Sequence, residues 1–160
     1  MILIRLDKEV LVFQLATRER LLLLELLKVY PQLPPAHRVV SKSIQLPDQA
    51  TSQRLLDEAL AEQLAENKRQ LQTLANDPHR WTDQQAHWLL RLSQSELERM
   101  LQILNDIRVG SWVQLGSPEQ WSETISPEKA PRLWAMELAG AFQMAFLHAL
   151  EGRNGLESSA

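Results

Sequence analysis

The polar residues most able to bind a ligand lie in residues 104–108, which read Leu-Asn-Asp-Ile-Arg. At helical spacing Arg108 shares a face with four leucines, so it interrupts an apolar stripe. A guanidinium drawn into a helix interface needs a carboxylate or several carbonyl groups, because its loss of water is otherwise uncompensated. Glu137, which lies among apolar residues near the C-terminus, is the candidate partner. Three interpretations stay open: an ion pair between Arg108 and Glu137, a ligand site that includes Asn105 and Asp106, or an arginine whose charge reaches solvent.

Other chemistry is not indicated by the residue types and their spacing. The absence of cysteine excludes disulfides, thiolate metal sites and cysteine nucleophiles. The helix-bundle di-iron pattern places Glu three residues before His, and none of the four histidines has Glu there. The five glycines do not cluster into a phosphate-binding loop, and no serine has the context of a nucleophile elbow. We therefore expect no catalytic residue, no bound metal and no cofactor.

The five tryptophans are the other residues of interest. Trp81 and Trp121 lie in or beside predicted loops, where an exposed tryptophan is a good interface anchor. The alternative is that both cover the ends of a helical bundle. Trp88, Trp112 and Trp134 fall in predicted helices, so we expect them in the core or half-buried.

The elements that must position these residues begin with a β-hairpin over residues 1–15. Two runs rich in β-forming residues, at 2–6 and 10–15, flank a polar turn, and a lone hairpin needs an apolar support. Thr17 is a candidate N-cap for a helix over 18–30, whose leucines cover most of its circumference and predict burial near the centre. The proline-rich residues 31–47 predict an extended connection, either a strap across the bundle or a functional loop.

Four further helices are predicted after this connection. A long helix runs from about Asp48 or Thr51 to Ala75, with an apolar stripe that contains Asn67. Capping-box patterns, Thr82 with Gln85 and Ser95 with Glu98, predict a short helix to about Leu92 and a longer one to about Leu115, ended by Gly116. The last helix covers about 132–150, and residues 152–160 are expected to be a flexible tail. The predicted fold is thus mainly α: one domain over 1–151, with about five helices (17–151) behind the hairpin.

Composition narrows the class of protein. A chain of 160 residues with 44% apolar residues suits one domain with its own core. The net charge of −3 and the lack of nucleic-acid signatures argue against a nucleic-acid partner. The N-terminus does not read as a signal peptide, and the leucine run at 21–27 is too short to span a membrane. We expect a cytoplasmic protein with no membrane partner.

Residues 101–110, Leu-Gln-Ile-Leu-Asn-Asp-Ile-Arg-Val-Gly, followed by the Gln-Leu-Gly of 114–116 and the Arg-Leu-Trp of 132–134, resemble the DUF2017 family of bacterial proteins of unknown function. The resemblance covers 95–150 and is looser before that. The chain departs from the family pattern at 110–114, which lacks the family's arginine, and at 143–145, which is bulkier. The resemblance implies no known activity. It implies that members often lie beside the gene of a Clp-protease adaptor, hence an accessory role near regulated proteolysis.

These observations favour a non-enzymatic protein–protein interaction module with an unidentified protein partner. The alternative is a small-ligand-binding protein or an enzyme that uses Arg108, Asp106 and Glu137. A homodimer formed through the apolar helices is a third hypothesis.

Overall fold

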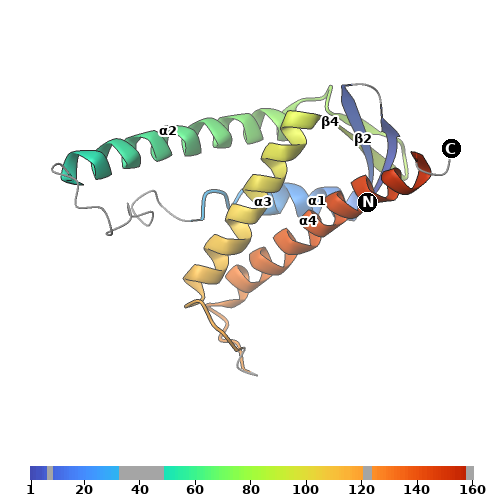
Figure 1. The fold of residues 1–160 in the computed structure, drawn as a ribbon. Helices are drawn as coiled ribbons and strands as arrows, with labels where there is room; N and C mark the ends of the chain where they lie inside the picture. The colour runs from blue at the N-terminus through green and yellow to red at the C-terminus, as the bar shows by residue number, and fades with distance from the viewer. Residues whose placement is uncertain (7–8, 33–48, 121–123, 158–160) are drawn as a thin grey trace.

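The computed structural model describes residues 1–6, 9–32, 49–120 and 124–157 (Figure 1). The fold is mainly helical, as expected, but it differs from the predicted bundle of about five helices behind a hairpin, because the described residues form four helices and a four-stranded antiparallel sheet. In chain order the elements are β1 (Ile2–Leu6), β2 (Val10–Ala16), α1 (Thr17–Leu27), α2 (Gln49–Asn76), β3 (Trp81–Asp83), β4 (His87–Ser93), α3 (Gln94–Gln114) and α4 (Ala130–Glu157).

The short helix predicted over 82–92 is instead the β3–β4 hairpin. The side chain of Asp83 accepts a hydrogen bond from the Gln85 backbone N–H at 2.8 Å, and Gln85 has a φ of 67°. This Asx-type turn reverses the chain where a helix needs right-handed φ values. β4 then pairs with β2, so the N-terminal hairpin is half of one sheet with the strand order β1-β2-β4-β3.

The inner face of the sheet forms the core together with the helices. Leu11 pairs with Leu92 and Phe13 with Leu90, and all four side chains are buried. Phe13 meets Phe146 of α4 edge to face, with 5.0 Å between the ring centroids. The sheet and α4 therefore share one hydrophobic core, which holds α4 against the strands.

α1 follows β2 without a loop. Its N-cap is Ala16 rather than the predicted Thr17, and Glu19 accepts hydrogen bonds from the Ala16 N–H and the Met1 amino group, both at 2.7 Å. Partial burial of Glu19 opposes ionisation, but these hydrogen bonds and the Met1 charge outweigh it, so the pKa of Glu19 lies below its ordinary value. The prediction of burial all round is only partly met, because Leu21 is exposed while three other leucines are buried.

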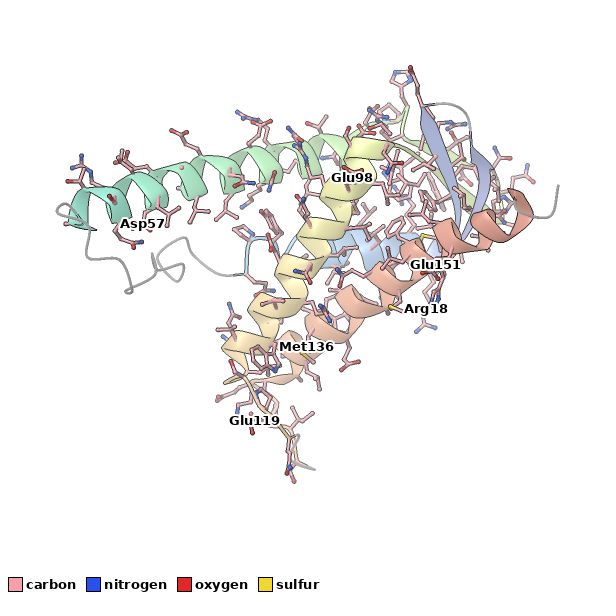
Figure 2. The ribbon with its side chains drawn as sticks, in the orientation of Figure 1. Arg18, Asp57, Glu98, Glu119, Met136 and Glu151 are labelled. Atoms are coloured by element: carbon pink, nitrogen blue, oxygen red, sulfur yellow. The ribbon has the colours of Figure 1, made fainter. Side chains whose placement is uncertain are left out.

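α2 agrees with the predicted long helix and projects from the rest of the fold as an arm (Figure 1). Leu71 and Leu74, in its C-terminal part, are buried in the core, and Asn67 donates a hydrogen bond to the Tyr30 hydroxyl at 3.2 Å. Leu55, near its start, is 57% exposed, and Figure 2 labels Asp57 at the same end of the helix. Among the described residues, α2 contacts the core through Leu64, Leu71 and Leu74. Of the proline-rich connection predicted over 31–47, residues 33–47 lie outside the described residues.

α3 and α4 lie side by side as an antiparallel pair (Figure 1). The capping box of α3 is Ser93 with Glu96, not the predicted Ser95 with Glu98: Ser93 Oγ accepts from the Glu96 N–H, and the Glu96 carboxylate from the Ser93 N–H. Gly116 has a φ of +93° just beyond the helix, which confirms the predicted stop. α4 runs past the predicted end near residue 150 and includes 152–157, which were predicted to belong to a tail.

Candidate interaction surface

The structure brings together three of the four residues of the predicted polar cluster. Arg108 Nη2 donates a hydrogen bond to Asn105 Oδ1 at 3.0 Å, and Arg108 and Glu137 line the same groove between α3 and α4. Asp106 lies elsewhere and lines a separate pocket of about 250 Å³ with Tyr30. The cluster proposed as a ligand site is therefore divided between two sides of α3.

Arg108 is exposed, and no ion pair joins it to Glu137 among the described parts of the chain. Its Cδ atom lies 3.6 Å from the position that a Cβ atom on Gly140 would occupy. The aliphatic part of the side chain thus covers the α4 backbone while the guanidinium reaches solvent, as expected for a long basic side chain beside an apolar surface. Of the three interpretations left open by the sequence, this geometry is that of an arginine whose charge reaches the surface.

The groove between α3 and α4 has a volume of about 780 Å³. Large apolar side chains line it and are accessible to solvent: Val109 and Trp112 from α3, and Met144 and Leu147 from α4, with exposures between 39% and 51%. Figure 2 labels Met136, another lining residue, on α4 where it runs beside α3. Scattered exposed leucines are normal on protein surfaces, but a contiguous apolar patch marks an interaction site.

The groove exists because α3 and α4 are apolar on two sides. One side of each helix faces the core, where Leu104, Ile107, Ala139 and Phe142 are buried. A helix that buries one stripe within its own chain is normally polar on the other side. The residues that line the groove do not follow this pattern, because Arg108 and Glu137 are the charged residues among them and most of the others are apolar. Packing of the hydrophobic core therefore accounts for the buried side of α3 and α4, but not for the apolar residues on their exposed side.

The structure describes four of the five tryptophans, and it places three of them otherwise than the sequence suggested. Trp81 was left open between an interface anchor and a cover for the end of the bundle; it is 6% exposed and its Nε1 donates a hydrogen bond to the Leu74 carbonyl oxygen at 3.1 Å, which is not the position of an exposed anchor. Trp121 lies outside the described residues. Trp112 and Trp134, expected in the core or half-buried, are 39% and 41% exposed. The aromatic surface available to a partner thus lies on the helix pair and not on Trp81.

A cation–π arrangement that the sequence did not reveal links α1 to the sheet. The guanidinium carbon of Arg20 lies 4.0 Å from the ring centroid of Trp88 on β4, which is a strand residue and not helical as predicted. It lies 5.1 Å from the Trp81 ring. No period or spacing in the sequence relates Arg20 to these rings, because the contact depends on the pairing of distant strands. Because both rings belong to strands of the sheet, Arg20 holds α1 against the sheet.

A cluster of ion pairs lies at the junction of α2, β3 and α3. Arg80 forms ion pairs with Asp77 at 3.6 Å and with Glu96 at 2.5 Å, beside a pocket of about 200 Å³. These contacts hold the start of β3 to the first turn of α3. Within the described ranges no group of three or more histidine, aspartate or glutamate side chains is arranged to hold a metal ion.

α4 is the one helix of the described chain that is long and apolar enough, by length and composition, to cross a membrane. The segment is Ala130–Glu151, with a mean hydropathy of 1.2. Core helices pass the same test, and Ala135, Ala139, Phe142 and Phe146 of this helix are buried against the rest of the fold. The composition of α4 therefore reflects its core side together with its exposed apolar side.

Searches of protein families, of curated proteins and of solved structures find no match to this chain. The resemblance of residues 95–150 to the DUF2017 family stays a prediction.

Proposed function

We propose that this chain is a non-enzymatic interaction module that binds another polypeptide through the groove between α3 and α4. The observation that supports this function is the exposure of a continuous apolar surface on two helices that already bury a full apolar stripe in the core. Covering such a surface removes apolar area from water, which is the main favourable term in protein association. The module is proposed to act in the cytoplasm.

The alternative function, binding of a small ligand by Arg108, Asp106 and Glu137, has less support. Asp106 lines a different pocket from the other two residues. Ligand sites bury most of the ligand surface and aim a few polar groups at it from several directions. In the groove, the two charged side chains stand on an open apolar surface, which suits the edge of a protein interface better.

The proposed function is tested by affinity capture of the tagged full chain from its native host, with two matched variants. Trp112→Glu places a charge in the groove, whereas Leu55→Glu also replaces an exposed apolar side chain by a carboxylate, but in the N-terminal part of α2. We expect the wild-type chain and Leu55→Glu to retain the same bound polypeptide and Trp112→Glu to lose it. The resemblance to the DUF2017 family directs the first search to proteins of regulated proteolysis.

Thermal melts of the three chains are the necessary control. Both substituted side chains are exposed by more than a third, so we expect little change in stability from either variant. Equal retention of the bound polypeptide by Trp112→Glu and by the wild type would overturn the proposed docking surface.

A further inference from the structure

We propose that the polypeptide that covers the groove is a second copy of this chain, related by a twofold axis that passes through the groove near Gly140. This inference rests on the proposed function and names its partner. In the dimer, Arg108 of each copy contacts Glu137 of the other, and the α3–α4 pairs of the two copies form a four-helix arrangement.

The charges of the groove are the first argument. Arg108 stands on α3 and Glu137 on α4, so the two opposite charges occupy opposite walls of one groove. Within the described chain they do not pair with each other, and the polar contact of the Arg108 guanidinium is the neutral side chain of Asn105. A surface with one positive and one negative wall is complementary to itself after a rotation by 180°.

Symmetry makes this complementarity specific. In an isologous contact, if residue i of one copy meets residue j of the other, j also meets i. A twofold axis that passes midway between the two charges sets Arg108 of each copy opposite Glu137 of the other copy. We place this axis on the seam of the two helices near Gly140, because the Arg108 side chain contacts Gly140 and Glu137 lies three residues before Gly140 on α4. A single placement of the axis therefore forms two ion pairs and excludes like-charge contacts between these residues.

The shape of the groove is the second argument. Gly140 and Ala141 contribute minimal side chains to its lining, while Trp112 on α3 and Met144 on α4 are large and exposed. The groove thus combines small residues with large apolar side chains, and in the proposed dimer Trp112 and Met144 of each copy pack against the groove of the other. Association of two helix pairs would cover the second apolar side of both α3 and α4, as a four-helix bundle covers its inner faces.

Sedimentation velocity of the full chain tests the proposal, at concentrations up to about 100 μM so that a micromolar dimer is populated. We expect the wild type to dimerise. Arg108→Glu alone sets two carboxylates against each other at both contacts, and Glu137→Arg alone sets two guanidinium groups against each other at both contacts. Each single variant should weaken dimerisation about tenfold or more, since like charges replace opposite charges twice in the interface.

The decisive experiment mixes the two single variants. In the mixed dimer both contacts join a glutamate of one chain to an arginine of the other, so mixing restores opposite charges at both contacts. The double variant that carries Arg108→Glu and Glu137→Arg together also restores them, because each substituted position then faces its opposite charge in the other copy. We therefore expect the double variant to recover the dimerisation that each single variant weakens, and the mixture of the two single variants to form mixed dimers that neither forms alone.

Controls separate this rescue from an effect inside one chain. Thermal melts of the monomers at low concentration should show little difference among the single and double variants, because both side chains lie on the groove surface and do not pair within the chain. Trp112→Glu should abolish dimerisation and Leu55→Glu should leave it unchanged.

Two results would overturn the proposal: a wild-type chain that sediments as a monomer throughout, or a dimer that the double variant does not restore. A monomeric chain that still captures another polypeptide in a Trp112-dependent manner would remove the second copy but leave the proposed function intact. A monomeric chain without such capture would contradict both.

Discussion

Replacement of Gly140 by alanine should stabilise the monomer, although Gly140 lines the groove. The residue is inside α4, where glycine is less favourable than alanine by about 0.8–1.0 kcal/mol. A Cβ atom at this position would meet only the Arg108 Cδ atom, at the ordinary contact distance of 3.6 Å, and that atom belongs to a flexible, exposed side chain. No steric cost offsets the gain in helix propensity. We expect the free energy of unfolding to rise by about 1 kcal/mol, which raises Tm by about 2–4 °C for a chain of this size.

Urea unfolding followed by circular dichroism, at a protein concentration low enough to avoid association, measures this change. Ala141→Gly is the matched control, because it makes the reverse substitution one residue further along the same helix at an exposed position. It should lower the free energy of unfolding by about the same amount. A loss of stability in Gly140→Ala would refute the reasoning, because it would mean that residue 140 is enclosed more tightly than its contact with Arg108 indicates.

Three further predictions concern the core and the N-terminus. Ser111→Ala should raise the free energy of unfolding by about 1 kcal/mol in urea titrations, because the Ser111 hydroxyl is fully buried with no hydrogen-bond partner in the described structure; a clear loss would reveal a partner. Phe146→Ala should lower it by about 3–5 kcal/mol in the same assay, since Phe146 is fully buried against Phe13, and a loss well below this range would contradict the shared core. The pKa of Glu19 is lower in the folded chain than in the unfolded chain. The ionised carboxylate therefore stabilises the fold at pH values above the unfolded pKa, and this stabilisation is lost as the pH falls through the folded pKa. Glu19→Gln should therefore destabilise the chain near neutral pH and make little difference in acid, and a difference independent of pH, in melts from about pH 3 to 7, would contradict this linkage.

The helices of this fold were largely predictable from the sequence, whereas the second half of the sheet was not. The pattern of α2 gave its bounds to within a residue or two, and Gly116 marked the end of α3. At 82–92, Thr82 and Gln85 fit a capping box by residue type alone. The alternation of buried Leu90 and Leu92 with less buried neighbours was the strand signal, but it becomes decisive only when β2 is available to pair with β4.

The cap of α3 shows a related limit. Residues 93–98 contain two overlapping capping-box patterns, and both satisfy the same local rule. The end of β4 at Ser93 selects the first pattern. A strand that is held by its neighbours in the sheet thus decides where the following helix begins.

The candidate surface was predicted in part. Residues 104–108 drew attention to Arg108, because an arginine on an apolar stripe is unusual, and Arg108 does line the groove. Periodicity identifies which residues share a helix face, but it does not tell which of two apolar faces will be buried within the chain. For that reason Trp112 and Trp134 were expected in the core or half-buried, although both are exposed.

The central place of β4 in the sheet has a consequence for the order in which the chain folds. Ala16 pairs with His87 and Val10 with Ser93, so the middle of the sheet joins segments that α1 and α2 separate along the chain. Contacts so distant in sequence form late, because the entropy of closing the intervening chain must be lost first. During synthesis the first hairpin leaves the ribosome well before its neighbouring strand. Until β4 arrives, β2 has an open edge beside a largely apolar face, and we expect a nascent chain that ends before residue 81 to be prone to aggregation.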